Sequence, residues 1–187
     1  MKNISFKLIQ LITLLTLVQC YYYNPNKRNM THKLNFYTQY NQFYISSDDA
    51  KSIDSGNNWD DKALNDRLGI LKNTLIVHTE SYGDIKGEVI ILEKPNDDIK
   101  FDLYDHIVEG GIEIESGFLD ILDCPNITSQ LRINLNPGKY RIRIYSSNLD
   151  SVEENDLAND NDNDFYKIEI WPENNMETIV LKKYHRI

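Results

Sequence analysis

Hydrophobic and polar residues alternate in short runs along most of the chain. At 131–135 and again at 140–144, leucine, isoleucine or tyrosine occupies every second position. Successive side chains of a β-strand point to opposite faces of a sheet, so this pattern predicts strands with one buried and one exposed face. An Asn-Pro-Gly segment at 136–138 lies between the two runs, and a Pro-Gly pair suits a type II turn. We predict a β-hairpin here, with Ile133 and Ile142 buried.

Other short runs predict further strands. Turn-forming residues at 82–87 and at 116–117 each separate two apolar runs, which predicts two more hairpins. A strand at 165–171 is expected to end at Pro172, and 178–181 is expected to form the last strand. The remaining strands are expected within 36–45 and at 75–78, 88–93, 112–115 and 118–121.

Only the segment from Trp59 to Leu71 favours a helix. Asp60 is suited to cap it, and Ala63, Leu64 and Leu68 share a helical spacing with Leu71. No long helices alternate with the strands, as they would around a parallel sheet. The pattern therefore predicts an all-β fold, a two-layer antiparallel β-sandwich with one short accessory helix.

The beginning of the chain differs from the rest. Residues 1–20 combine early lysines with a short apolar run, which is typical of a secretory signal and too short to span a bilayer. Residues 21–33 are polar and are expected to form a linker, followed by a single domain at 34–187. Export would place the protein outside the cell or in the cell envelope. If Met30 is instead the true start, the protein is cytoplasmic.

Composition narrows the classes of partner. The chain has 187 residues, 41% of them hydrophobic, which is enough for one domain with a real core. Its formal net charge is -9. Nucleic-acid binding needs a clustered basic face, which the sequence lacks. An acidic protein is better suited to a basic protein partner.

The densest acidic stretch is 150–164, which is expected to be a mobile, solvated loop. Asp and Asn alternate at 160–164, as in a hand-type calcium loop. Phe165 stands where such a loop needs glycine, however, and Trp171 stands where it needs a bidentate glutamate. The motif fails, and we predict no metal and no cofactor, although a loose calcium site through these carboxylates stays an alternative.

Signs of catalysis are few. The chain has no nucleophile-elbow motif, no phosphate-binding glycine loop and no zinc-binding histidine pair. His106 and Glu109 are spaced to share a helical face, which would provide a base and an orienting carboxylate. The alternative is a structural segment in which Leu103, Ile107 and Val108 fill the core. We predict that the protein is not an enzyme.

Two other features have both a structural and a functional interpretation. Arg132, Arg141 and Arg143 would share one face of the predicted hairpin at 131–144. That face would either bind an acidic group or be an ordinary solvated surface balanced by carboxylates. Cys124 is expected to be a small buried residue, with a reactive thiol as the alternative.

Four motifs, in order, resemble the competence protein J (ComJ) group and related uncharacterised bacterial proteins. The motifs are Tyr40–Ile45, Trp59-Asp60 with Ala63, Val108–Ser116 and Leu135–Ile142. Members of the group are small acidic bacterial proteins associated with inhibition of a DNA-entry nuclease. The resemblance, which covers residues 34–171, implies a β-sandwich and an inhibitor role. It carries over no inhibitory residues by position.

Taken together, these features predict a non-catalytic acidic binding protein, an inhibitor or immunity-type factor for a nuclease or another basic protein. The predicted contact residues are Asp156, Asp160, Asp162 and Asp164, whose charges would steer the encounter. The alternative is an exported β-sandwich that binds a carbohydrate or another surface ligand through Tyr21, Tyr22, Tyr23 and loop aromatics. A hydrolase that uses His106 is the third hypothesis.

Overall fold

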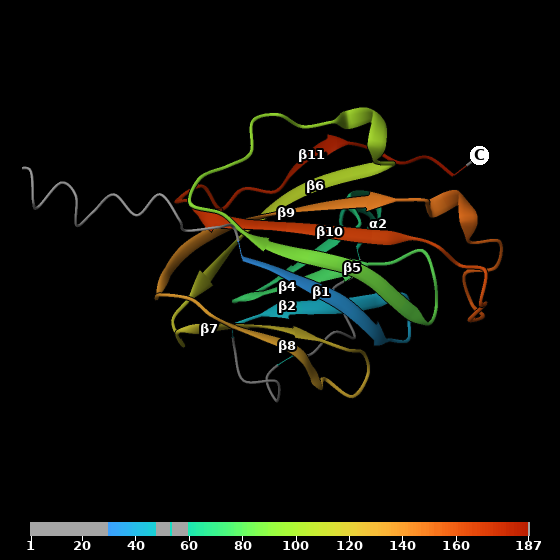
Figure 1. Cartoon of the computed structure of the whole chain (residues 1–187), viewed down its shortest axis with the longest axis horizontal. Coiled ribbons are helices and arrows are strands. Elements are labelled where there is room, and N and C mark those ends of the chain that lie inside the picture. Colours follow the sequence, from blue (N-terminus) through green and yellow to red (C-terminus); the bar gives the residue numbers. More distant parts are fainter. Residues whose placement is uncertain (1–29, 48–52, 54–59, 187) are drawn as a thin grey trace, which may run out of the picture.

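The computed structural model describes residues 30–47, 53 and 60–186. The predicted signal segment and residues 21–29 of the predicted linker lie outside the described residues. Within the described part, two β-sheets pack face to face, as Figure 1 shows, with one short helix beside them. The predicted all-β sandwich with an accessory helix is therefore confirmed.

The larger sheet has six strands in the order β1-β5-β10-β9-β6-β11. Their bounds are Met30–Tyr37 (β1), Asp84–Ile91 (β5), Phe165–Pro172 (β10), Gly138–Ser147 (β9), His106–Ile114 (β6) and Ile179–Lys182 (β11). Strand β1 begins at Met30, inside the segment expected to be a linker. Strands β10 and β11 lie within a residue of the predicted positions.

The smaller sheet has five strands in the order β3-β4-β2-β7-β8. Their bounds are Leu68–Leu71 (β3), Thr74–His78 (β4), Gln42–Ser46 (β2), Phe118–Leu122 (β7) and Ser129–Asn134 (β8). Short 3-10 turns at Phe101–Leu103 (η2) and Leu149–Ser151 (η3) lie in the connections.

The core lies between the two sheets and is built from alternate side chains. Ile142 of β9 is fully buried and Ile133 of β8 is 4% exposed, as the alternation predicts. One continuous apolar cluster joins them to residues of both layers, among them Phe43, Val89 and Ile168. Burial of these side chains from two facing sheets is the main stabilising contribution to the fold.

All three predicted hairpins are wrong, and for the same reason. Strand β8 pairs with β7, whereas β9 pairs with β6 and β10, so the turn at 136–138 joins two different sheets. The chain also changes sheets between β4 and β5 and between β6 and β7. A turn residue predicts that the chain reverses, and alternation predicts which face is buried. Neither specifies the strand that accepts the hydrogen bonds.

One strand pairing is parallel, although a wholly antiparallel sandwich was expected. Strand β10 runs parallel to β5, while the other pairings among the described strands are antiparallel. Gly87 of β5 makes this close approach possible, because a Cβ atom there would lie 2.2 Å from the carbonyl oxygen of Tyr166. The sheet therefore needs glycine at this position.

The helix is shorter than predicted. Asp60 caps it as expected, accepting a hydrogen bond from the Ala63 amide at 2.7 Å, and helix α2 then spans Asp61–Asp66. Arg67 adopts a left-handed conformation with φ 54°, which ends the helix. Leu68 and Leu71, expected on the helix, belong to β3, where they join the smaller sheet.

Candidate functional site

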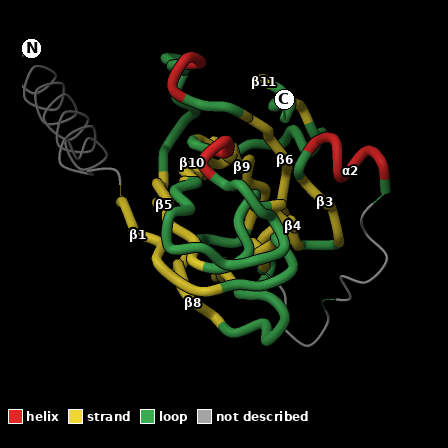
Figure 2. The backbone as a smooth tube through the Cα atoms, turned by 90° about the vertical axis from the view of Figure 1, so that its right-hand side faces the viewer, coloured by secondary structure: helices red, strands yellow, loops and turns green. Residues whose placement is uncertain are grey.

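Three connecting loops meet at one end of the sandwich. They are the β1–β2 loop at 38–41, the β4–β5 loop at 79–83 and the β9–β10 loop at 148–164. The Asn41 side chain joins all three, because its amide donates to the carbonyl oxygens of Glu80 (3.0 Å) and Asn155 (2.9 Å). Figure 2 looks onto this side of the molecule, with loops in front of the strands. We call these three loops the acidic end.

The name follows from the charge of the longest loop. Segment 148–164 contains seven acidic residues and no lysine or arginine. Five of the seven acidic side chains are exposed: Asp150, Glu153, Glu154, Asp156 and Asp160. The loop thus presents a concentrated negative charge to solvent.

The four predicted contact residues divide into two pairs. Asp156 and Asp160 are exposed, as a contact role requires. Asp162 and Asp164 are buried, with 7% and 1% of their surface exposed. The sequence prediction treated all four alike because the alternating Asp-Asn pattern does not reveal which way each side chain turns.

Asp164 holds the loop to its neighbours. Its Oδ2 accepts hydrogen bonds from the Ser81 amide (3.0 Å), the Ser81 hydroxyl (2.9 Å) and the Tyr166 hydroxyl (2.6 Å). Burial, reinforced by the Asp164 charge, raises the pKa of Tyr166 well above its usual value, so this hydroxyl keeps its proton and remains a donor. Asp164 therefore has a structural role.

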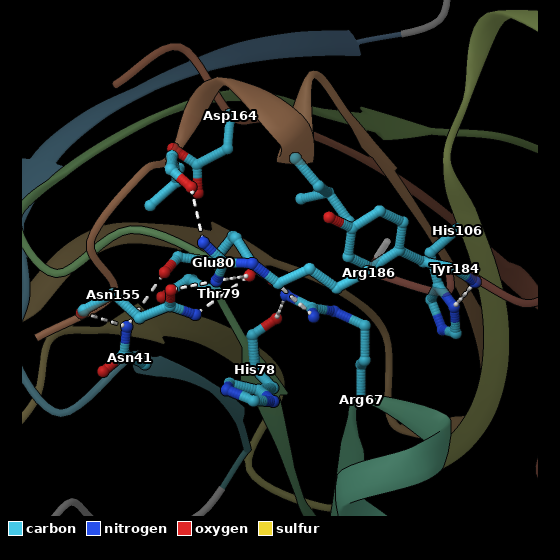
Figure 3. A network of polar contacts seen from close by, with 12 residues as sticks. Asn41, Arg67, His78, Thr79, Glu80, His106, Asn155, Asp164, Tyr184 and Arg186 are labelled. Atoms are coloured by element: carbon cyan, nitrogen blue, oxygen red, sulfur yellow. Dashed lines mark hydrogen bonds and ion pairs between the residues drawn. The ribbon is translucent and has the colours of Figure 1, made fainter. Parts of the chain in front are cut away.

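A second buried carboxylate, Glu80, fixes the middle of the loop (Figure 3). It accepts from Arg67 (2.7 Å), from Asn155 (2.9 Å) and from Arg186 near the end of the chain (2.9 Å). Arg186 also donates to the carbonyl oxygens of Val152 and Glu153. The loop was expected to be solvated along its whole length, but these contacts tie it to the body of the sandwich.

Tyrosines lie beside this loop. Tyr40 is 63% exposed and Tyr37 is 48% exposed. The Tyr40 and Tyr82 rings form an edge-to-face pair with centroids 6.3 Å apart. Ala158 packs so closely on Gly83 that a Cβ atom at Gly83 would lie 3.0 Å from the Ala158 Cβ. The tyrosines thus adjoin the acidic loop, an arrangement that no local pattern in the sequence predicts.

The predicted arginine stripe does not exist, because its members lie on different sheets. Arg132 of β8 is paired with Asp120 on the smaller sheet at 2.6 Å. Arg141 and Arg143 of β9 are buried on the outer face of the larger sheet, where both bind Glu109, at 2.5 and 2.6 Å. These side chains were expected to face solvent, but the connections before β6 and after β10 cover Arg141 and Arg143.

This buried network continues across the sheet. Arg143 donates to the Tyr145 hydroxyl (3.1 Å), and Tyr145 donates to Glu169 (2.7 Å), which also pairs with Lys167 (2.8 Å). A cleft of about 940 Å³ lies beside Lys167 and Glu169 and is bordered by residues 92–98. Four acidic residues (Glu93, Asp97, Asp98 and Glu169) and two lysines (Lys94 and Lys167) line this cleft. The network holds the covering segments on the sheet, because Arg141 and Arg143 donate to the carbonyl oxygens of Asn96, Asn175 and Glu177.

The catalytic interpretation of His106 does not fit its surroundings. His106 is on strand β6, where a spacing of three puts Glu109 on the opposite face, so the two side chains do not share a helical face. Its Nε2 bonds the Asp66 carbonyl (3.0 Å) and its Nδ1 accepts from the Tyr184 amide (3.3 Å). Burial lowers the pKa of His106 to about 4, although the hydrogen bond to Asp66 opposes this.

The structural alternative for this segment holds in part. Ile107 and Val108 are buried as expected, but Leu103 is 67% exposed and does not fill the core. Cys124 is buried, with the Tyr44 hydroxyl and the Gln42 amide each 3.2 Å from its sulfur. A small buried residue was the expectation for Cys124.

The described residues contain neither a cluster of metal ligands nor a helix that could span a membrane. In that part of the chain, no group of three or more His, Cys, Asp or Glu side chains could hold a metal ion. No helix there has the length and apolar character needed to cross a membrane. Tyr21, Tyr22 and Tyr23, the proposed ligand-binding aromatics, lie outside the described residues.

Fold and surface together define a class: an acidic β-sandwich whose loops gather exposed carboxylates and tyrosines at one end. Solved structures of the same fold include ComJ from Bacillus subtilis, an inhibitor of the DNA-degrading activity of NucA. That match has a TM-score of 0.57 and 13% identity and covers 78% of this chain and 98% of ComJ.

The product of crocagin biosynthetic gene J also matches, with a TM-score of 0.53 and 15% identity over 79% of this chain and 99% of that protein. No family model and no curated protein sequence matches the chain. The resemblance to the ComJ group is therefore confirmed as a similarity of fold.

Proposed function

We propose that this protein is a non-catalytic binding protein that inhibits a nuclease or another basic protein by docking through its acidic end. The observation that carries the proposal is the group of five exposed carboxylates on a loop without any basic residue. Such a concentration of charge speeds the encounter with an oppositely charged surface. ComJ, which has the same fold, inhibits a DNA-degrading protein.

The anchoring of the loop supports the same proposal. Glu80 and Arg186 hold residues 152–155 against the sandwich. A loop that is already ordered loses less conformational entropy when it binds, so more of the interaction energy contributes to affinity. A solvated acidic tail would serve solubility without such anchoring.

The experiment compares two charge-neutralised variants. In the first, Asp156 and Asp160 are replaced by asparagine, and in the second, Asp97 and Asp98 are replaced in the same way. All four side chains are exposed, and both variants lose two charges. Each chain is immobilised and used to capture proteins from the cells that produce it, and the captured fraction is assayed for DNA degradation with and without added wild-type protein.

We expect the wild type and the Asp97/Asp98 variant to capture a basic protein whose nuclease activity the added wild type suppresses. Capture should weaken as salt rises, because the pairing charges are exposed. The Asp156/Asp160 variant should capture much less. Equal capture by both variants, or capture that is indifferent to salt, would refute the proposal.

A further inference from the structure

Two tyrosines of the acidic end, the exposed Tyr40 and the half-buried Tyr82, are placed where a cation would be bound. Tyr40 and Tyr82 come from two different loops, and their rings stand at 67° to one another. This arrangement leaves aromatic faces open to solvent, since Tyr40 is 63% exposed. The face of an aromatic ring carries negative electrostatic potential and attracts cations.

The backbone at Tyr40 adds an independent observation. Tyr40 and Asn41 have φ angles of 57° and 51°, both in the left-handed region. Asparagine tolerates this conformation, whereas a bulky tyrosine is disfavoured there. Tyr40 gains little burial in return. A strained and exposed aromatic residue that the core does not need indicates a role in recognition.

The negative charge of the adjoining loop restricts the chemistry of the occupant. Ala158, which packs on Gly83 next to Tyr82, lies between Asp156 and Asp160 in the loop. A neutral sugar would stack on the tyrosines and could donate hydroxyl hydrogen bonds to carboxylates, but it carries no charge for the acidic loop to attract. A cationic side chain gains from both.

Arginine matches this surface better than lysine. Its guanidinium group is planar and weakly hydrated, so it stacks on an aromatic ring and can still bond a carboxylate through its edge. The lysine ammonium is compact and strongly hydrated. A surface that combines tyrosine faces with carboxylates should therefore discriminate between the two cations.

We propose that Tyr40 and Tyr82, together with the adjoining loop that carries Asp156 and Asp160, form a recognition site for an arginine side chain of a basic protein partner. This inference rests on the proposed function and names the partner chemistry at the same surface. Tyrosine is also among the residues that most often dominate the energy of protein interfaces.

The test uses peptides of seven arginines and of seven lysines as probes, with binding measured by calorimetry at low and high salt. The wild type should bind the arginine peptide about fivefold more tightly, the ratio that corresponds to a stronger cation–π contact by about 1 kcal/mol for arginine than for lysine. Substituting Tyr40→Ala together with Tyr82→Ala should remove this preference by weakening the arginine peptide several times more than the lysine peptide. Tyr40→Phe with Tyr82→Phe should keep it, because the rings remain.

Replacing Asp156 and Asp160 by asparagine should weaken both peptides together, which separates the charge effect from the aromatic effect. Loss of the arginine preference only in the alanine variant supports the inference, even if no nuclease is ever captured. Equal affinity for the two peptides, or a preference that survives both alanine substitutions, overturns it. Binding of the wild type to a glycan array that depends on the same two tyrosines would also overturn it.

Discussion

Replacing Glu109 by glutamine removes the carboxylate that lies between two buried guanidinium groups. Glu109 binds Arg141 through one oxygen and Arg143 through the other, and all three side chains are at most 8% exposed. In the variant, the new amide nitrogen would face one of the two guanidinium groups as a second donor. One arginine would then lose its acceptor at this position.

The loss of the Glu109 charge should affect Arg141 more than Arg143. Arg143 keeps the Asn96 carbonyl, the Tyr145 hydroxyl and the Glu169 carboxylate at 3.7 Å. Arg141 keeps the carbonyl oxygens of Asn175 and Glu177, which carry no formal charge. Removing one partner of a buried ion pair costs about 3–5 kcal/mol. For a chain of this size the loss corresponds to a fall in melting temperature of roughly 6–20 °C.

The assay is urea denaturation followed by circular dichroism, with Glu113→Gln as the matched control. Glu113 lies four residues further along β6 on the same face and is exposed, so its substitution removes the same charge and should cost no more than about 0.5 kcal/mol. Adding Arg141→Gln to Glu109→Gln should recover part of the loss. If Glu109→Gln and Glu113→Gln had equal unfolding midpoints, the reasoning about the buried network would be refuted.

Three further predictions concern other parts of the fold. Gly87→Ala should lower the unfolding free energy by about 3 kcal/mol in urea titrations, since the new methyl group would overlap the Tyr166 carbonyl. Wild-type stability should fall as the pH drops from 6.5 to 4, because the folded chain resists protonating His106, whose pKa is about 4 against about 6.5 when unfolded. This loss is about 3 kcal/mol, and His106→Gln should reduce it. Arg186→Ala should speed amide hydrogen exchange at residues 152–155 at least severalfold while global stability changes by less than about 1 kcal/mol.

Each of these predictions has an outcome that would contradict it. An unchanged urea midpoint for Gly87→Ala would mean that β5 and β10 can move apart without any loss of stability. If the stability of wild type and His106→Gln depended on pH in the same way, another group would be responsible for the loss. His78 would be tested first, because burial also lowers its pKa to about 4. If Lys183→Ala and Arg186→Ala changed amide hydrogen exchange at residues 152–155 equally, Arg186 would not be the anchor of this loop.

Particular residues show where prediction from the sequence succeeded. Ile133 and Ile142 are buried, Asp60 caps the helix and Pro172 ends β10, as the local patterns predict. Each of these features depends on a residue and its near neighbours. Alternation, capping and proline geometry act over a few positions, so they can be inferred without knowing the rest of the fold.

Other residues show where prediction from the sequence failed. Asp164 and Glu80 were not distinguished from exposed acids, because their partners Ser81 and Arg186 come from segments far away in the chain. The tyrosine pair of the acidic end was missed for the same reason, since Tyr40 and Tyr82 meet only after two loops are brought to one end of the sandwich.

By itself, the sequence determined which side chains along each strand would be buried, because a strand alternates faces whatever its neighbours are. It also determined a strongly acidic chain with its charge concentrated in one segment. Only the tertiary structure decided which strands pair, where the chain passes from one sheet to the other, and which carboxylates remain exposed. These outcomes depend on hydrogen bonds and ion pairs between distant segments, and such contacts exist only once both layers have packed together.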